Sequence, residues 1–433
     1  MKRSSIVVVL LCLGTAHARA QTSVRLTLDA AIARGLEASH RVAEIDARQD
    51  AARAVEVQRK AASLPQLALL AGYARTNHVD AFGIPGGPLI YPDVPDNYRS
   101  RIDLQWPIYT GGRTSALMRA AAAETNAIAQ DRDAARADLK LDITRAYWAV
   151  ITARASVDVI TEALARIGAH LSDVRNQLNV GLVPPSEVLS LEAQQARQQM
   201  LLIEAQNLAD TSAADFRRLA GLTTDAPFEL ADRIDAPAVV SQQISPLVEA
   251  ARANRAERKA LEIRIGALGD RKAAAEAGRL PVIATVGGYD VARPNPKIFP
   301  RLAAWKPSWD IGVNLTWSLS DGGRVRGEVA EAAANQRAAE ERLKDFDANV
   351  DLEVRQRAAD LASAEAAIAA AEVGVRSAAE ARRVIADRFS AGVATNTDVI
   401  DAQGVLLQAE LDRTRSLANA HLAAARLDRA VGR

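Results

Sequence analysis

Cysteine is almost absent from this chain of 433 residues, and the single one, Cys12, lies in a short apolar run near its start. That run follows Lys2 and Arg3 and ends at the triplet Ala18-Arg19-Ala20. A basic start, a short apolar core and a small-x-small end are typical of a secretory signal peptide, here expected over residues 1–20. The mature chain would then contain no cysteine and no disulfide.

A surplus of positive charge is also lacking. The chain has 54 basic and 53 acidic residues, and removal of the expected signal peptide with its three basic residues leaves 51 against 53. Binding to nucleic acid depends on basic side chains that neutralise phosphates. We therefore expect no nucleic-acid partner.

Long apolar runs and recognisable active-site patterns are absent as well. No run after residue 20 approaches the roughly eighteen apolar residues of a membrane helix. The histidines of the mature chain, His40, His78, His170 and His421, stand apart without metal-ligand spacing. No glycine-rich segment carries the Lys-Ser/Thr of a phosphate loop. We expect no cofactor, no metal and no catalytic site, and hence no enzyme.

The composition favours a mainly helical protein, rich in Ala, Leu, Glu, Gln and Arg. Residues 26–63 are expected to form a helical region that Thr27 opens. A proline-free run follows from residue 113 to about 180, and at about 1.5 Å per residue it would be on the order of 100 Å long. Such a length is typical of coiled coils rather than of globular cores. A further helix is expected over 186–220.

Landmarks of the first half return in the second half. The offset is 216 residues from Leu64-Pro65 to Leu280-Pro281 and 211 residues thereafter. We infer an internal duplication with repeats at 21–222 and 244–433, joined by a linker at 223–243. The pairs at 211 residues are Leu104-x-Trp106 with Leu315-x-Trp317, Gly111-Gly112-Arg113 with Gly322-Gly323-Arg324, and Gly181 with Gly392.

Each half contains two strand-length segments, expected at about 66–76 and 98–109, then 281–292 and 308–319. The last alternates clearly, with Trp309, Ile311 and Val313 on one face and Asp310 and Asn314 on the other. Segments of this length can cross a bilayer at a tilt. Aromatic residues favour the membrane interface and gather here: Tyr73, Tyr98, Trp106, Tyr109, Tyr289, Trp305, Trp309 and Trp317.

The four strand-length segments have two possible interpretations. A small soluble sheet packed on the helices would leave the aromatic clustering unexplained. Membrane strands would require several chains to share one barrel, because four strands cannot close one and lipid-exposed backbone must be hydrogen-bonded. The strand count alone does not fix the number of chains.

Two helix–turn–helix tips are expected at about 181–187 and 392–398. In each, a Gly ends a long helix and an acid followed by Val opens the next one. Small and aliphatic groups at exposed turns suit docking of a partner helix, although ordinary packing of the turn is the alternative. The candidate partner contacts are Gly181, Leu182, Val188, Gly392, Val393 and Val399.

The duplicated helix–strand–strand–helix order, the Gly-Gly-Arg after the second and fourth strands, and the tip motifs together resemble the TolC family of outer-membrane efflux proteins. The resemblance covers essentially the whole mature chain. It implies a homotrimer in the outer membrane of a Gram-negative bacterium. Three chains would form a twelve-stranded transmembrane β-barrel, surrounded by outer-membrane lipid, and an α-helical barrel across the periplasm.

The resemblance also implies a function. The chain would be the passive exit duct of a tripartite efflux pump or a type I secretion system. Its tips would meet a periplasmic adaptor, or membrane fusion protein, fed by an inner-membrane pump of the RND, ABC or MFS type. A soluble periplasmic coiled-coil scaffold is the alternative; it would have no membrane strands.

Acidic residues at the tips are the candidate pore constriction. Asp398 and Asp401 are three residues apart on a helix start, so they share a face, and symmetry would stack them as rings that select cations. The resemblance assigns the constriction to these two positions, and Glu187 is the matching acid of the first tip. Asp398 as a simple helix cap is the alternative. The family's basic residue in the second tip loop is missing: residues 392–397 contain no Arg or Lys, and Arg388 lies before the turn.

Overall fold

The computed structural model describes residues 24–237 and 243–433. The expected signal peptide and five residues of the expected linker lie outside them. The chain folds into two compact units. The tip unit consists of the described parts of residues 1–39, 139–239 and 361–425, and the sheet unit of the described parts of 40–138, 240–360 and 426–433. Each unit therefore combines segments from both halves of the sequence.

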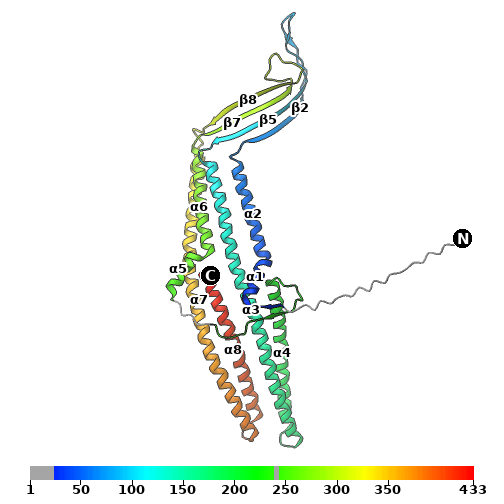
Figure 1. Cartoon of the computed structure of the whole chain (residues 1–433), viewed down its shortest axis with the longest axis vertical. Helices are drawn as coiled ribbons and strands as arrows, with labels where there is room; N and C mark the ends of the chain where they lie inside the picture. Colours follow the sequence, from blue (N-terminus) through cyan, green and yellow to red (C-terminus); the bar gives the residue numbers. More distant parts are fainter. Residues whose placement is uncertain (1–23, 238–242) are drawn as a thin grey trace, which may run out of the picture. The chain divides into compact units, whose positions relative to one another are not determined.

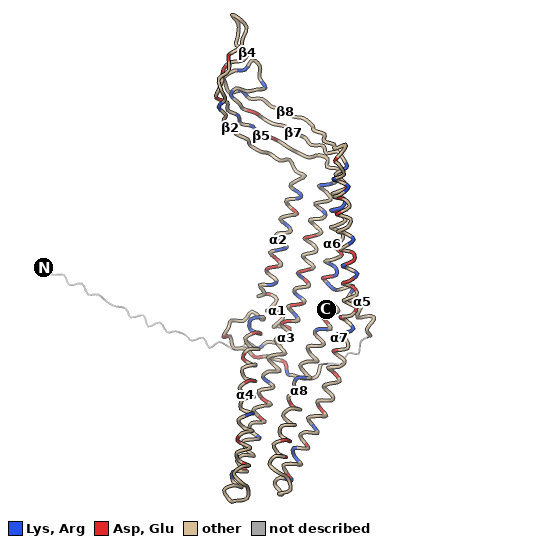
Figure 2. The backbone as a smooth tube through the Cα atoms, turned by 180° about the vertical axis from the view of Figure 1, so that it is seen from behind, with Lys and Arg blue, Asp and Glu red and all other residues tan. Residues whose placement is uncertain are grey.

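A long helix followed by a shorter one occurs twice along the chain (Figure 1). Helices α3 (Arg113–Asn179) and α7 (Arg324–Ser390) each have 67 residues. Helices α4 (Pro185–Leu219) and α8 (Asn396–Val431) follow them. The starts and ends of α3 and α7, and the starts of α4 and α8, are 211 residues apart. Acidic and basic residues both occur along these helices (Figure 2).

The expected helical region 26–63 is two helices rather than one, which corrects the sequence-based expectation. Helix α1 (Leu28–Ala38) ends at Ser39, whose backbone is extended, and α2 (His40–Ala61) begins directly after it. Thr27 does open α1, because its hydroxyl accepts the Ala30 N–H at 3.3 Å. The second half has the same break between α5 (Ile244–Asn254) and α6 (Ala256–Glu276), followed by the short 3₁₀ helix η1 (Ala277–Arg279). None of the described helices has an apolar stretch long enough to cross a membrane.

A small parallel sheet in the tip unit has no clear sequence signal. Strand β1 (Val24–Leu26) pairs with β6 (Phe228–Leu230). The hydroxyl of the fully buried Tyr147 lies 2.7 Å from Asp232 Oδ2 and 3.2 Å from the Leu26 carbonyl oxygen. Burial and the Asp232 carboxylate both raise the pKa of Tyr147, so the phenol stays neutral and ties this sheet to α3.

The main sheet lies in the sheet unit and is antiparallel in the order β2-β5-β7-β8 (Figure 1). Its strands are β2 (Gln66–Arg75), β5 (Asp96–Tyr109), β7 (Val282–Arg293) and β8 (Lys306–Thr316). A short hairpin of β3 (Phe82–Gly83) and β4 (Leu89–Tyr91) lies in the connection between β2 and β5.

The strand bounds differ from the expected ones by at most three residues. Strand β8 ends at Thr316, so Trp317 and Leu319 lie beyond it. Thr316 pairs with Val282, and the preceding Pro281 has no N–H with which to continue the ladder. The rest of the expected alternation in this segment is present.

Candidate functional site

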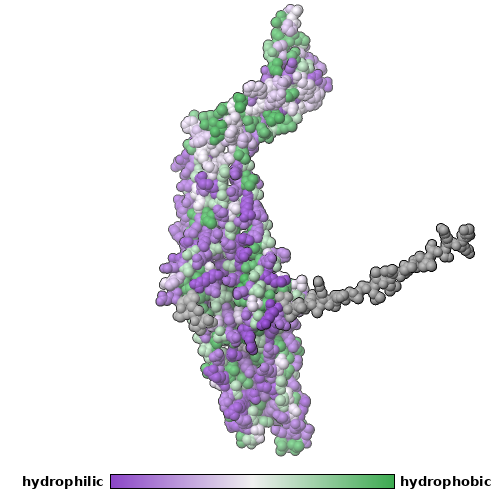
Figure 3. Space-filling model, in the orientation of Figure 1, coloured by the Kyte–Doolittle hydropathy of each residue, from purple (hydrophilic) through white to green (hydrophobic). Residues whose placement is uncertain are grey.

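The main sheet separates an apolar face from a polar one. Successive side chains of a strand point to opposite faces, and the strand register sets like residues beside each other. Hydrophobic residues gather over the strands, whereas hydrophilic ones cover much of the helices (Figure 3). The apolar face carries large and solvent-exposed side chains: Leu67, Leu69, Tyr73, Ile102, Trp106, Tyr289, Trp309, Ile311, Val313 and Leu315.

The expected interface aromatics lie near the two ends of the strands. Tyr73 and Tyr98 are paired across β2 and β5 at the end that leads into the loops, with ring centroids 5.0 Å apart. Trp305 lies next to Tyr98, 5.7 Å between centroids, while Tyr289 pairs with Trp309 on the next two strands.

Trp106, Tyr109 and Trp317 lie at the other end of the strands, which leads into the helices. The two tryptophans occupy equivalent positions in the two halves. Trp106 donates its indole N–H to the Ser63 carbonyl at 3.2 Å, and Trp317 donates to the Arg279 carbonyl at 3.1 Å. Rings with one polar edge at both ends of an apolar band are typical of membrane strands.

The polar face carries a charge network that sequence reasoning missed. The guanidinium of Arg101 contacts the carboxylates of Asp103 and Asp290 and lies 2.8 Å from Asp310. A side chain at Gly288 would put its Cβ 2.3 Å from this guanidinium, so the glycine provides the space. The available signal was the placement of these charged residues at alternate strand positions, opposite the apolar ones.

The two helical tips have the same backbone. Gly181 and Gly392 have positive φ values of 76° and 74° and follow the ends of α3 and α7. In the first tip the N–H groups of Gly181 and Leu182 donate to the last free carbonyls of α3, both at 2.9 Å. Gly392 and Val393 repeat both bonds on α7 at the same distance. Both tips therefore end in a Schellman motif, which favours a glycine at this position.

The starts of the following helices differ. Helix α4 begins after Pro184, which offers no side-chain cap. Helix α8 begins after Thr395, whose hydroxyl accepts the Asp398 N–H at 3.2 Å. In return Asp398 Oδ2 accepts the N–H and the hydroxyl of Thr395 at 2.8 and 2.7 Å. This is a capping box, and these hydrogen bonds lower the pKa of Asp398.

The structure brings Asp398 and Asp401 to one surface. Both are exposed, and both line a cavity of about 270 Å³ together with Ala378 and Ile385 of α7. Asp398 therefore caps its helix and also faces the same cavity as Asp401. Glu187, the acid of the first tip, is half-buried at the start of α4.

The six expected partner contacts fall into two groups. Leu182 and Val393 are 75% and 63% exposed, and the adjacent Gly181 and Gly392 are exposed too. Val188 and Val399 are only 8% and 3% exposed. Val188 belongs to a cluster with Leu171, Val174 and Leu191, packed against Phe389 and Ile400. These two valines therefore pack within the tips.

Asn396 links the two tips and was not singled out from the sequence. It is buried, its Oδ1 lies 2.8 Å from His170 Nε2 of α3, and its amide donates to the Glu187 carbonyl at 3.3 Å. The ring of His170 also meets Phe389 edge-on, with centroids 5.0 Å apart. Polar hydrogen bonds thus connect the tips where the sequence offered no basic loop residue.

Comparison with known proteins gives a consistent picture. The chain is 24% identical to the outer membrane protein TolC of Vibrio cholerae over 391 residues, which cover 90% of this chain and 86% of TolC. It is 25% identical to the protein CyaE of Bordetella pertussis over 365 residues, covering 82% and 74%. The crystal structure of the outer membrane protein VceC from Vibrio cholerae has the same fold, with a TM-score of 0.78, 21% identity and coverage of 94% and 96%.

The family model described as outer membrane efflux protein matches residues 31–222 and 247–433. The match takes in both tips and all four strands of the main sheet, and it favours an export channel over a soluble scaffold. The mainly helical fold with these strands and the outer-membrane localisation agree with the sequence-based expectation. The chain belongs to the outer membrane efflux protein family.

Proposed function

We propose that this chain is the passive exit duct of a tripartite efflux pump or a type I secretion system and that it works as a homotrimer. One observation carries the proposal: the main sheet has an exposed apolar face and two open edges. Strands β2 and β8 form its edges, and within the described residues neither has a second neighbour. In lipid these edge groups must be hydrogen-bonded, so β8 of one copy would pair with β2 of the next. The family resemblance supports three copies and a barrel of twelve strands.

The tips are the proposed contact with a periplasmic adaptor. The exposed Leu182 and Val393, with Gly181 and Gly392 beside them, would meet the adaptor directly. Val188 and Val399 would support the turns from within. A pump of the RND, ABC or MFS type in the inner membrane would supply the energy, and adaptor binding would move the tip helices apart.

Asp398, Asp401 and Glu187 are the proposed constriction. The two aspartates share a surface, and three-fold repetition would concentrate their charge at the narrow end of the duct. Rings of carboxylates favour cations and bind multivalent cations tightly enough to block flow.

Single-channel conductance in a planar bilayer tests both the duct and the constriction. The test variant is Asp398→Asn/Asp401→Asn, because an asparagine oxygen can still accept the Thr395 hydrogen bonds while the charge is removed. We expect wild-type currents to be small, cation-selective and blocked by trivalent cations, and the variant to lose selectivity and block.

The control is Glu204→Gln/Asp210→Asn, which removes two exposed carboxylates from α4 away from the tip. It should behave as wild type. Currents that are identical in all three proteins would reject the constriction but keep the duct. Absence of channels, with protein recovered outside the membrane fraction, would reject the duct itself.

A further inference from the structure

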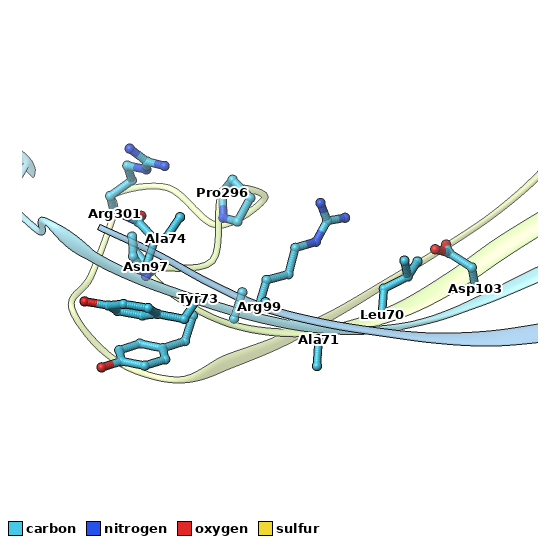
Figure 4. A pocket seen from close by; sticks show the side chains of 13 residues that line it. Leu70, Ala71, Tyr73, Ala74, Asn97, Arg99, Asp103, Pro296 and Arg301 are labelled. Atoms are coloured by element: carbon cyan, nitrogen blue, oxygen red, sulfur yellow. The ribbon is translucent and has the colours of Figure 1, made fainter. Parts of the chain in front are cut away.

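The segment between β7 and β8, residues 294–305 (the exit loop), lies over the polar face of the main sheet. Figure 4 shows Pro296 and Arg301 of the exit loop on the same side of the strands as Arg99, whereas Tyr73 and Ala71 point to the other side. A cavity of about 510 Å³ lies there, lined by strand residues of β2, β5 and β7 and by the exit loop. The loop therefore covers the wall of the sheet instead of extending away from it.

A buried asparagine fixes the start of the exit loop. The side-chain amide of Asn295 donates to the Lys306 carbonyl at 2.8 Å and to the Ser308 hydroxyl at 2.9 Å, both on β8. Its Oδ1 accepts the N–H of Lys297 at 2.9 Å. These three bonds turn the loop back over the strands and aim Lys297 at the sheet.

Lys297 then joins the charge network of the polar face. Its ammonium lies 2.8 Å from Asp290 Oδ2 and also contacts Asp310. Asp290 is buried and additionally accepts from Arg99 at 3.1 Å. The exit loop is thus held by ion pairs to carboxylates that Arg101 already positions on the wall.

The far part of the exit loop is tied to the hairpin of β3 and β4. The N–H of Arg301 donates to the Ile90 carbonyl at 3.3 Å. Its guanidinium donates to the Tyr91 hydroxyl at 2.5 Å and lies 4.8 Å from the centre of that ring, in a cation–π contact. Two loops on the same end of the sheet, distant in sequence, are therefore fastened together.

We propose that the exit loop is a second constriction at the outer end of the duct, folded inward and latched by Asn295, Lys297 and Arg301. This rests on the proposed function, in which the polar face of the sheet lines the duct. A loop lying over that face narrows the passage, and three copies would do so together. The tips select what enters the duct, and the exit loop limits the size of what leaves it.

Cysteine labelling tests the inference directly, because the only native cysteine, Cys12, lies in the expected signal peptide. The reporter is Leu70→Cys, on the polar face and in the cavity under the loop. Intact cells are treated from outside with a small charged maleimide and, separately, with a bulky polymer-linked maleimide. We expect the small reagent to react readily and the bulky one slowly.

The latch variant Asn295→Ala/Lys297→Met should raise the rate of the bulky reagent at Leu70→Cys by about tenfold or more, because labelling follows the open fraction of the loop. Lys306→Met is the matched control. It also removes one positive charge next to the exit loop, but within the described chain Lys306 forms no ion pair. Lys297→Arg should keep the slow rate.

The reporter Leu69→Cys separates failure of this inference from failure of the duct. Leu69 lies on the apolar face and should resist both reagents in lipid. If Leu69→Cys reacts as fast as Leu70→Cys, the apolar face of the sheet is not embedded in lipid, and the proposed duct function is rejected. Suppose instead that Leu69→Cys does not react, but the bulky reagent labels Leu70→Cys equally fast with and without the Asn295→Ala/Lys297→Met change. The proposed duct function is then kept and the second constriction is rejected.

Discussion

The first and second tips have one backbone and two chemistries. Gly181 and Gly392 end the long helices with the same Schellman motif, and Leu182 and Val393 are exposed beside them. The first tip then starts its next helix with Pro184 and Pro185, whereas the second uses the capping box of Thr395 and Asp398 and the buried Asn396.

This difference shows which part of a duplicated element stays constant. The positive φ of the turn favours glycine at one position, and both copies have it. A helix start can be stabilised in several ways. A proline at the first position needs no hydrogen bond, while Thr395 and Asp398 form three with each other. The side chain that connects the two tips by hydrogen bonds, Asn396, belongs to the second tip.

Asn396→Ala should produce the largest difference between the tips. It leaves the Glu187 carbonyl without its amide partner and His170 without its acceptor, at a cost of about 1–3 kcal/mol for buried groups. We expect faster hydrogen exchange in the turns of both tips, because the amide joins them. Thr397→Ala, on the exposed next residue, should leave exchange unchanged. Equal exchange in both variants would show that the tips do not depend on Asn396.

Thr395→Ala should weaken only the second tip. Loss of a side-chain cap costs about 1 kcal/mol. The first turn of α8 should therefore exchange faster while the first turn of α4 keeps its rate, and Thr395→Ser should restore the wild-type value. A change of equal size in α4 would mean that the two starts are coupled more strongly than their separate hydrogen bonds indicate.

Low pH should also weaken the second tip, as the loss of its cap does. Hydrogen bonds lower the pKa of Asp398 in the folded tip, so its stabilising contribution is fully present above its unfolded pKa of about 4. The contribution is lost as the pH falls through the lower folded pKa. Exchange in the first turn of α8 should therefore rise below about pH 4 in the wild type but not in Asp398→Asn. A rise of the same size in Asp398→Asn would assign the effect to another group.

Substitution of the two glycines should give the smallest difference. Gly181→Ala and Gly392→Ala each place a Cβ at positive φ, which costs about 1 kcal/mol. Apart from the adjacent residues of the chain, no atom lies within 4 Å of either added Cβ, so backbone strain decides the cost and both tips should open equally. Unequal exchange in the two variants would reveal a contact at one turn that the backbone geometry does not explain.

The sequence predicted those features that depend on local pattern. Tip glycines, strand alternation and long proline-free helices follow from backbone sterics and periodicity, and the aromatic residues marked the strand ends. The polar face could be predicted from the alternation, but the bonding partners of Asn396, Arg101 and the exit loop could not. Asn396 bonds to residues 209 and 226 positions away, and Arg101 to residues 189 and 209 positions away, so only the folded chain brings them together. The break at Ser39 was missed because neither Gly nor Pro marks it.

The open edges of the main sheet have a consequence for biogenesis. For a chain that works as proposed, a single copy in lipid would expose two rows of unpaired backbone groups, each costing several kcal/mol. Insertion and ring closure must therefore be one event, and no stable intermediate with one or two inserted copies is available. A subunit whose β2 or β8 cannot pair would prevent ring closure of the normal subunits that it joins. Alleles that encode such a subunit should therefore be dominant in a cell that also carries the normal allele.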